Sequence, residues 1–308
     1  MNILSLFGGI ECGYEACNRA KITIDKYYYS EVNKYAIQVA KKNHPSIIEL
    51  GDVTKWKEWD IDWNNIDLLL GGSPCQGFSF SGKGLNFEDP RSKLFFEYAE
   101  ILKHIQKVNP KVIFLLENVK MKKEYQDIIS KYLGIEPIEI NSRLMSAQNR
   151  VRLYWTNIQG IEQPQDKKIY LEDILENNEY IAPGAVRGRR LNNGTVVGRR
   201  LNSEGHREDY NKEIPISQCL EVRRTNTNKS NCLTTVEKDN VLTSLPIGQY
   251  KDAFKNKLPF RYYTVKEYCK LQTLPDNYMD GVSDSQAKKL LGNGWTVDVI
   301  AHILSFIK

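Results

Sequence analysis

The chain has 308 residues, of which 41% are hydrophobic and 26% charged, a composition typical of a globular protein with room for one large α/β domain and a smaller one. No apolar run approaches the ~18 residues that span a bilayer, so a membrane protein is not expected. The formal charge of +5 at pH 7 permits a polyanionic partner without requiring one.

From the N-terminus onward, short apolar runs alternate with helical patterns, which is typical of a mostly parallel sheet joined by crossover helices. Most of the runs are short and apolar, as expected for strands covered on both faces. Apolar residues that recur roughly every 3.6 positions predict helices over residues 31–42, 94–108 and 296–307. The runs expected to form strands are residues 3–7, 27–30, 47–50, 66–70, 112–116, 138–140 and 152–156.

The segment 162–257 differs, because helical periodicity fades and Asn, Gly, Arg and Thr become frequent. The sequence Gly-Arg-Arg-Leu-Asn occurs there twice, at residues 188–192 and 198–202. Two copies predict a β-hairpin or paired strands, since a solenoid needs at least about three repeats. We expect this segment to form a smaller, mostly β domain, and residues 1–161 and 258–308 to build one α/β domain together.

The first strand candidate runs into a glycine-rich turn, Phe7-Gly8-Gly9-Ile10-Glu11-Cys12-Gly13, which precedes a helix. Such a turn lets backbone N–H groups approach a ligand at a helix N-terminus. Glu31 ends the second strand candidate, where a carboxylate can bind both hydroxyls of a ribose. Asp52 ends the third and can accept a hydrogen bond from an adenine amino group. These groups predict a nucleoside-type ligand, with a spacing that is not that of a dinucleotide fingerprint.

Cys75 follows the fourth strand candidate in the run Gly-Gly-Ser-Pro-Cys-Gln-Gly-Phe-Ser. Such a thiol is either a small buried hydrophobe or a nucleophile whose thiolate is favoured by its neighbours. Glu117 follows the next strand candidate in Glu-Asn-Val, where partial desolvation suits a proton donor. Arg150 and Arg152 alternate onto one face of an extended segment, Gln-Asn-Arg-Val-Arg, and two adjacent guanidiniums repel unless they face anions.

The motifs Phe-x-Gly-Ile, Gly-Asp-Val, Pro-Cys-Gln, Glu-Asn-Val and Gln-x-Arg-x-Arg, in this order, resemble those of the DNA cytosine methyltransferases of bacteria and phages. Glu11 and Cys12 stand where bacterial members usually have glycines. This version, with residues 93–97 and 292–297, is similar to the catalytic domain of the animal de novo methyltransferases. The resemblance is weakest between residues 162 and 257. It implies a Rossmann-like methyltransferase fold that binds S-adenosylmethionine (SAM), with a mostly parallel seven-stranded sheet and a smaller, mainly β target-recognition domain.

The resemblance implies methylation of cytosine at carbon 5, by a transient bond between the Cys75 thiolate and carbon 6 of a flipped base. It places Glu117 at ring nitrogen 3, Arg152 at the carbonyl oxygen and Arg150 beside the thiolate. The residues it implies for the SAM pocket are Phe7, Gly8, Gly9, Ile10, Glu11, Cys12, Gly13, Glu31, Val32, Asp52, Val53, Gly72, Pro74, Leu94, Asn293, Gly294 and Trp295.

A basic region lies where the family has its target-recognition domain: residues 187–229 carry ten Lys or Arg against five acids. Composition alone favours a solvated loop, but Arg beside Gly also suits phosphate contact and reading of guanine. The long polar segment 76–93 predicts a lid over the nucleic acid. The expected DNA contacts are Gln76, Ser79, Ser81, Lys83, Arg187, Arg189, Arg190, Arg199, Arg200, Arg223 and Arg224.

Other functions stay open at this point. A tRNA cytosine methyltransferase would keep the chemistry and change the substrate, and a catalytically silent DNA-binding regulator would keep only the fold. A thiol hydrolase is disfavoured, because none of the four histidines lies in a segment typical of an active-site base.

The six cysteines include no Cys-x-x-Cys pair, so no metal site is expected, and free thiols fit a reducing compartment. The N-terminus is typical of a first core strand and not of a secretion signal. We expect a cytoplasmic monomer, bacterial or phage-encoded, that acts on double-stranded DNA with SAM and does not bind a membrane. A cognate restriction endonuclease stays open as a further partner.

Overall fold

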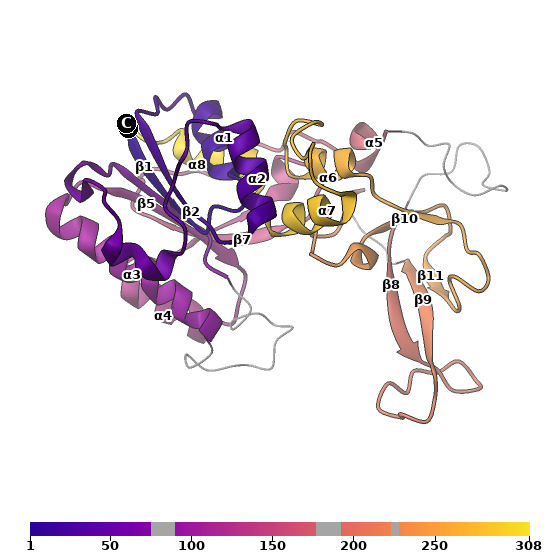
Figure 1. The fold of residues 1–308 in the computed structure, drawn as a ribbon. Helices are drawn as coiled ribbons and strands as arrows, with labels where there is room; N and C mark the ends of the chain where they lie inside the picture. The colour runs from indigo at the N-terminus through magenta and orange to yellow at the C-terminus, as the bar shows by residue number, and fades with distance from the viewer. Residues whose placement is uncertain (75–89, 177–191, 223–227) are drawn as a thin grey trace.

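Two β-sheets organise the chain in the computed structural model, which describes residues 1–74, 90–176, 192–222 and 228–308 (Figure 1). The first sheet has seven strands in the order β3-β2-β1-β4-β5-β7-β6. All seven overlap the runs expected from the sequence, so the predicted α/β class with a mostly parallel sheet is confirmed. They are β1 (Asn2–Leu6), β2 (Lys26–Ser30), β3 (Ile48–Glu49), β4 (Leu68–Gly71), β5 (Ile113–Val119), β6 (Ile138–Asn141) and β7 (Val151–Thr156).

Strand β5 is longer than its apolar run. The strands from β3 to β5 are parallel, whereas β7 is antiparallel to both β5 and β6. The ladder with β7 continues past the apolar residues and pairs Glu117 with Tyr154 and Val119 with Arg152. Glu117 therefore lies within a strand and not after one, contrary to the expectation from the sequence. Its backbone is held by a hydrogen-bonded ladder.

Helices cover both faces of this sheet, and each face has its own buried apolar cluster. Figure 1 shows α1 and α2 on one side and α3 and α4 on the other. The first cluster also includes side chains of α6, α7 and α8, and the second includes the short helix η1. The helices are α1 (Cys12–Arg19), α2 (Lys34–Asn43), α3 (Pro90–Val108), α4 (Lys123–Leu133), α5 (Leu171–Ile174), α6 (Val265–Leu271), α7 (Asp284–Asn293) and α8 (Val297–Leu304), with 3-10 helices η1 (Val53–Glu58), η2 (Trp63–Asn65), η3 (Ser142–Leu144) and η5 (Glu237–Asp239).

The three predicted helices are present, with different starting points. The helix expected over 31–42, α2, begins at Lys34 because the side chain of Asn33 accepts hydrogen bonds from the backbone N–H groups of Tyr35 and Ala36, as an N-cap does. Helix α3 begins at Pro90, so the last residues of the expected lid segment are helical. Proline suits a first helical position because its missing N–H would have no partner there. Residues 76–89 of that segment lie outside the described residues.

The two ends of the chain meet on the first sheet. Helix α8 packs against α1, and Arg19 of α1 forms an ion pair with Asp298 of α8 at 2.6 Å. The side chain of Gln272 also bridges α7 to the following turn, donating to the carbonyl oxygens of Leu291 and Gly294. The C-terminal helices thus form part of the same core as the N-terminal strands.

The second sheet is smaller and antiparallel, with the order β11-β9-β8-β10-β12. Its core is a separate cluster around Val196, Leu220 and Val241. In Figure 1, β8 and β9 extend away from the first sheet. The expected smaller, mainly β part of the fold is therefore confirmed. Its strands are β8 (Asn192–Arg200), β9 (Ile216–Val222), β10 (Val241–Thr243), β11 (Gly248–Tyr250) and β12 (Phe260–Tyr262), the last of which lies beyond residue 257.

The duplicated sequence takes part in this sheet along a single strand. Asn192, the last residue of the first copy, opens β8 and pairs with Thr243. The second copy continues along the same strand, where Arg199 pairs with Ser217 of β9. A hairpin of β8 and β9 does form, but the two copies do not pair with each other within the described residues. The described part of the first copy pairs with β10, and that of the second copy pairs with β9. Residues 188–191 lie outside the described residues.

Candidate active site

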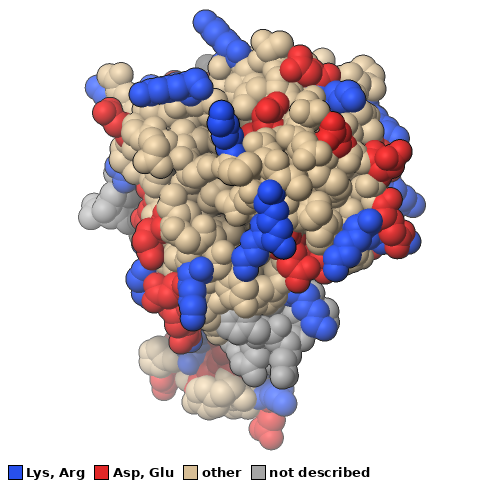
Figure 2. Space-filling view, turned by 90° about the vertical axis from the view of Figure 1, so that its left-hand side faces the viewer, with Lys and Arg blue, Asp and Glu red and all other residues tan. Residues whose placement is uncertain are grey.

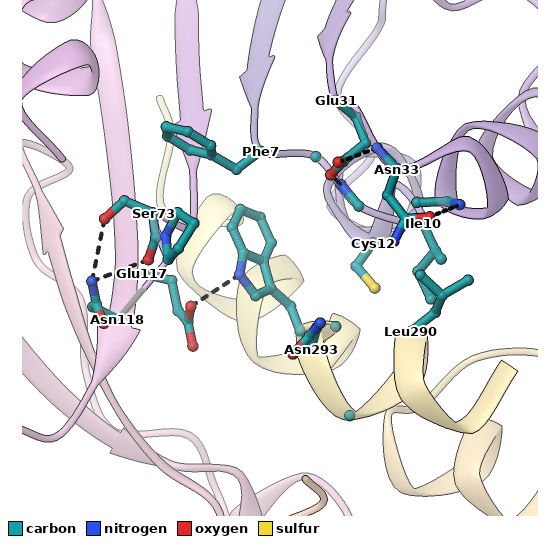
Figure 3. A pocket seen from close by; sticks show the side chains of 18 of the residues that line it. Phe7, Ile10, Cys12, Glu31, Asn33, Ser73, Glu117, Asn118, Leu290 and Asn293 are labelled. Atoms are coloured by element: carbon teal, nitrogen blue, oxygen red, sulfur yellow. Dashed lines mark hydrogen bonds between the residues drawn. The ribbon is translucent and has the colours of Figure 1, made fainter. Parts of the chain in front are cut away.

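A cavity of about 330 Å³ lies at the carboxyl ends of β1, β2 and β4, beside the last residues of β5. Ligands of open α/β sheets bind at this edge. Figure 3 shows Glu117, Asn118 and Ser73 at one end of the cavity and Glu31 and Asn33 at the other. The residues predicted from the sequence that line it are Phe7, Gly8, Gly9, Ile10, Cys12, Glu31, Gly72, Pro74, Glu117, Arg150, Arg152, Asn293, Gly294 and Trp295.

The Glu31 carboxylate is fixed by the backbone at one end of this cavity. One of its oxygens accepts from the Gly9 N–H at 3.0 Å, and the other accepts from the N–H groups of Val32 and Asn33 at 2.8 and 2.9 Å. Gly9 has a φ of +58°, which favours glycine. The carboxylate is therefore oriented before any ligand arrives, and its remaining lone pairs can accept from hydroxyl groups.

Gly8 must lack a side chain because Glu11 lies directly behind it. A Cβ at Gly8 would lie 2.0 Å from Oε1 of Glu11. Glu11 is fully buried and is not part of the cavity wall. The Tyr27 hydroxyl donates to its Oε2 at 2.6 Å, while Oε1 has no hydrogen-bond partner within the described residues. Burial raises the pKa of Glu11 to about 8, against the opposing effect of the Tyr27 hydrogen bond.

Several residues implied for SAM lie away from the cavity wall. Val32 is 70% exposed, and Val53 and Leu94 pack into the cluster under α3. Asp52 caps η1, where its Oδ1 accepts from the backbone N–H of Thr54 at 2.9 Å. Gly13 lies inside α1, where an added Cβ would meet the Tyr27 hydroxyl at 2.9 Å. Of the implied set, these five and Glu11 are the ones that the cavity does not bring together.

The cavity also has lining residues that the motifs did not single out. Asn33 caps α2 two positions after Glu31, so a search for the helix cap would have found it. Asn118 donates to the backbone oxygen and the hydroxyl of Ser73 at 3.4 and 3.3 Å, which ties the turn after β4 to β5. The missed residues are Asn33, Ala36, Ser73, Asn118, Val119, Leu290 and Gly292.

Glu117 lies between an ion-pair partner, Arg152, and a hydrogen-bond donor, Trp295, at the other end of the cavity. Its Oε1 is 2.9 Å from Nε of Arg152, and its Oε2 accepts from the indole N–H of Trp295 at 3.1 Å. Glu117 is 9% exposed and therefore nearly withdrawn from water. Pro74 lines the same region, and Cys75, the next residue in the chain, lies outside the described residues.

Trp295 connects the two ends of the cavity. Its indole lies against Gly72, where an added Cβ would approach Nε1 to 2.8 Å, and a Cβ at Gly13 would meet the ring at 3.5 Å. The same ring donates to Glu117. The sequence predicted Trp295 as a pocket residue, but its hydrogen bond to the carboxylate depends on how α8 packs.

Arg150 is buried at 3% exposure and binds backbone carbonyls from separate segments. It donates to Gly294 O at 2.9 Å, to Leu233 O at 3.1 Å and to Gly292 O at 3.4 Å. It directly precedes β7 and thus joins the start of this strand to the end of α7 and to the segment between β9 and β10. The neighbouring Gln148 accepts from the backbone N–H of Leu233 at 2.8 Å, which strengthens this connection.

Two of the expected DNA contacts are described, and both arginines bind within the hairpin of β8 and β9. Arg199 pairs with Glu221 at 2.9 Å. Arg200 donates to the backbone oxygens of Lys212 and Ile214. The other expected contacts, Gln76, Ser79, Ser81, Lys83, Arg187, Arg189, Arg190, Arg223 and Arg224, lie outside the described residues.

Charges of both signs are interspersed on the face of the first sheet's helices that points away from the second sheet (Figure 2). That face carries no single-sign field of the kind that attracts a polyanion. Within the described ranges, no group of three or more His, Cys, Asp or Glu residues could hold a metal ion. None of the helices in those ranges combines the length and apolar character of a membrane span.

Comparisons with known proteins agree with this arrangement. The family model for C-5 cytosine-specific DNA methylase matches residues 1–308. Type II methyltransferase M1.ScrFI of Lactococcus lactis subsp. cremoris is 32% identical over 328 residues, which cover 98% of this chain and 76% of that protein. Type II methyltransferase M.NgoBI of Neisseria gonorrhoeae is 29% identical, over 97% of this chain and 90% of that protein.

Solved structures show the same fold at lower sequence identity. The Entamoeba histolytica methyltransferase EhMeth superposes with a TM-score of 0.65 at 18% identity, over 99% of this chain and 97% of that one. The match spans the segments that form both sheets, so the two structures share their overall fold.

Proposed function

Because this chain belongs to the family of C-5 cytosine-specific DNA methylases, we propose that it methylates carbon 5 of cytosine in a specific duplex DNA sequence, with SAM as methyl donor, a flipped target base and a transient bond to Cys75. The enzyme class, a DNA (cytosine-5)-methyltransferase, follows from the family. The donor, the flipped base and the covalent step are the proposal.

The observation that supports this proposal most strongly is that the wall of one cavity contains both the residues expected to bind SAM and those expected to act on the base. The oriented Glu31 carboxylate and the glycine turn lie at one end, and Glu117, Arg152 and Pro74 lie at the other. A methyl donor and a base must meet within bonding distance, so a site with both sets in one wall is what the reaction requires.

The residues at the first end fit SAM. Glu31 would accept from the ribose hydroxyls, and Gly9 leaves open space at the backbone, since an added Cβ there would meet nothing within 4 Å. Phe7 and Trp295 supply aromatic surface at the cavity wall. When bound, SAM supplies a methyl group on a sulfonium that an electron-rich carbon can attack.

At the other end, the residues of the chain would prepare the base. The Cys75 thiolate adds to carbon 6 and moves an electron pair toward carbon 5. Glu117 hydrogen-bonds ring nitrogen 3, and Arg152 donates to the carbonyl oxygen, so both stabilise charge that develops on the ring. Loss of the carbon 5 proton after methylation returns the electron pair and releases the thiolate. Arg150, bound to three carbonyls, would hold this end of the cavity together.

Double-stranded DNA is the proposed substrate, and its target base must leave the stack to reach carbon 6. The projecting β8–β9 hairpin would approach the duplex, and Arg199 and Arg200 are proposed contacts together with the arginines outside the described residues. The Type II names of both relatives support a cognate restriction endonuclease as a functional partner. We propose that the enzyme acts as a monomer.

The test replaces Cys75 with Ala and measures three quantities: transfer of labelled methyl groups to duplex DNA, the Kd of SAM, and the position of 5-methylcytosine by bisulfite sequencing. We expect transfer to be lost while the Kd of SAM changes by less than about threefold, because the thiol acts on the base. Cys219→Ala, which removes a buried thiol of β9, is the matched control and should retain transfer. Wild-type turnover in Cys75→Ala, or methyl incorporation into tRNA and not into duplex DNA, would contradict the proposal.

A further inference from the structure

Cys232 lies against the arginine pair of the cavity. Cys232 belongs to the segment between β9 and β10 and is partly buried. Its sulfur accepts from Nη1 of Arg150 at 3.3 Å and from Nη2 of Arg152 at 3.6 Å. These are ordinary distances for hydrogen bonds to sulfur. The guanidiniums of Arg152 in β7 and of Arg150 just before it therefore converge on one atom of the segment between β9 and β10.

The charges around this atom leave a place for a second anion. Arg150 and Arg152 carry two positive charges, and Glu117 supplies one negative charge, which pairs with Arg152. Burial and the neighbouring Arg152 charge lower the pKa of Arg150. Burial raises the pKa of Tyr154 and of the Cys12 thiol, the other titratable groups that interact with Arg150, so both are neutral. Within the described residues, Cys232 is the group that can balance the remaining charge.

The sulfur responds to this environment. Burial alone would raise the pKa of the Cys232 thiol, but the charges of Arg150 and Arg152 and their hydrogen bonds lower it below its ordinary value. The other described cysteines shift the opposite way, because burial raises the pKa of both Cys12 and Cys269 to about 12. As a thiol, Cys232 would instead donate to the Leu233 carbonyl at 3.3 Å.

We propose that Cys232, as a thiolate, is the second counter-ion of the arginine pair and a positioning residue that holds Arg152 beside Glu117. The inference rests on the proposed function of these two residues. Arg152 donates through Nη2 to Cys232 and lies beside Glu117 through Nε, so the sulfur fixes the rotation of the guanidinium about its own axis. The segment that carries Cys232 connects β9 to β10 of the second sheet. The way this segment packs therefore sets the positions of Arg152 and Glu117 at the end of the cavity.

The first experiment measures the charge of the sulfur without turnover. Thiolate absorbance in the ultraviolet is recorded across pH for Cys75→Ala and for Cys75→Ala/Cys232→Ser, and the difference is the titration of Cys232. We expect a midpoint below the ordinary thiol value of about 8.5, and a higher midpoint when Arg152→Gln is added. A midpoint at or above the ordinary value, or one that ignores Arg152→Gln, would overturn the inference.

The second experiment measures methyl transfer by wild type, Cys232→Ala, Cys232→Ser and the control Cys219→Ala. We expect kcat to fall about tenfold in Cys232→Ala, with the KM for DNA changing less, because a hydrogen bond to a charged group is lost in the reacting geometry. Cys232→Ser should recover part of kcat, since its hydroxyl still accepts, and it carries the test should the alanine variant fail to fold. Equal kcat in wild type and both variants would overturn the inference. Absence of cytosine methylation by wild type would instead contradict the proposed function, and the titration would still decide the state of Cys232.

Discussion

Glu117 can be compared with another carboxylate of the same molecule in the same kind of contact. Trp295 donates to Glu117 at 3.1 Å inside the cavity, and Trp56 donates to Glu97 at 3.1 Å under α3. We predict that Glu117→Gln lowers kcat by roughly 10²–10⁴-fold, the range for loss of a general acid or base. Glu97→Gln removes the matched carboxylate outside the cavity and should leave kcat within about twofold. Steady-state methyl transfer measures both, and similar losses in the two variants would refute a chemical role for Glu117.

The buried Glu11 makes stability depend on pH. Burial raises its pKa from 4.5 to about 8 in the folded state, so the folded protein keeps a proton that the unfolded chain releases. The contribution of Glu11 to the free energy of unfolding is therefore highest below pH 4.5, the pKa of the unfolded chain. It falls as the pH rises from 4.5 to about 8 and levels off above the folded pKa of about 8. We predict that Glu11→Gln gains stability relative to wild type over this window, on the order of a few kcal/mol.

Urea unfolding at a series of pH values measures this difference between Glu11→Gln and wild type. The exposed Glu58 of η1 supplies the control, and Glu58→Gln should follow the wild-type curve. If the free energies of unfolding of Glu11→Gln and wild type ran parallel between pH 4.5 and about 8, Glu11 would be ionised in the folded protein.

The limits of the motifs are visible at single residues. Glu31 and Trp295 could be assigned to the cavity because a strand end and a glycine motif fix where their backbones lie. Asp52 also follows a strand, but its carboxylate caps η1, a use that depends on where the 3-10 helix begins. The Cys232 contacts join segments far apart in the chain, so no local pattern around that residue could indicate them.

At the scale of elements, the end of α7 contacts the segment between β9 and β10 of the second sheet at Gly292. A Cβ at Gly292 would lie 2.2 Å from the carbonyl oxygen of Thr234 and 2.5 Å from its carbonyl carbon, both backbone atoms that cannot turn aside. We predict that Gly292→Ala lowers the free energy of unfolding by about 1–3 kcal/mol, as overpacking does, despite alanine's higher helix propensity.

Gly294→Ala is the control for this effect. An added Cβ there would approach its nearest neighbour, the Cys12 sulfur, only to 3.4 Å. Chemical denaturation should give a loss below about 1 kcal/mol for it. A Gly292→Ala variant as stable as Gly294→Ala would show that α7 does not approach the Thr234 segment so closely.

The β8–β9 hairpin is stabilised by an ion pair between its strands. Arg199 and Glu221 are 2.9 Å apart, with 16% and 12% of their side chains exposed. We predict a coupling energy of about 0.5–3 kcal/mol between them, measured by a double-mutant cycle of Arg199→Gln and Glu221→Gln in urea. Strictly additive losses would mean that the pair does not stabilise the hairpin.

Strands and helices could be predicted from the sequence where the pattern of apolar residues within the segment itself determines the structure. Short, mostly apolar runs marked all seven strands of the first sheet. The inner strands are covered on both faces and are therefore apolar along most of their length, whereas β3 and β6 at the two edges each include an exposed Glu. The extension of β5 through Glu117 could not be predicted, since it depends on β7 lying antiparallel beside it. The duplicated Gly-Arg-Arg-Leu-Asn indicated a hairpin, but β9, which pairs with its second copy, has no sequence resemblance to it.

At the scale of the whole molecule, the active end is built where three remote parts of the chain converge. The N-terminal strands supply the glycine turn and Glu31, and β5 supplies Glu117. The start of β7 and the residue before it supply the arginine pair, and the end of α7 with the turn after it closes the wall with Trp295. The segment of Cys232 and Leu233 then joins the second sheet to this wall through Arg150. The proposed methyl-donor end, the proposed base end and the second sheet are therefore connected through one set of contacts, which is the basis of the proposed reaction.

The most direct test of the reaction is to trap the thiol that bonds the base. Duplex DNA with 5-fluorocytosine at the target position is incubated with SAM and enzyme, and the denaturation-resistant complex is digested and mapped by mass spectrometry. The fluorine cannot leave as a proton does, so the adduct persists. We predict an adduct on the peptide that contains Cys75, absent from Cys75→Ala and retained in Cys219→Ala. An adduct on Cys232, or methylation of ordinary cytosine by an enzyme that forms no adduct with the fluorinated base, would contradict the account.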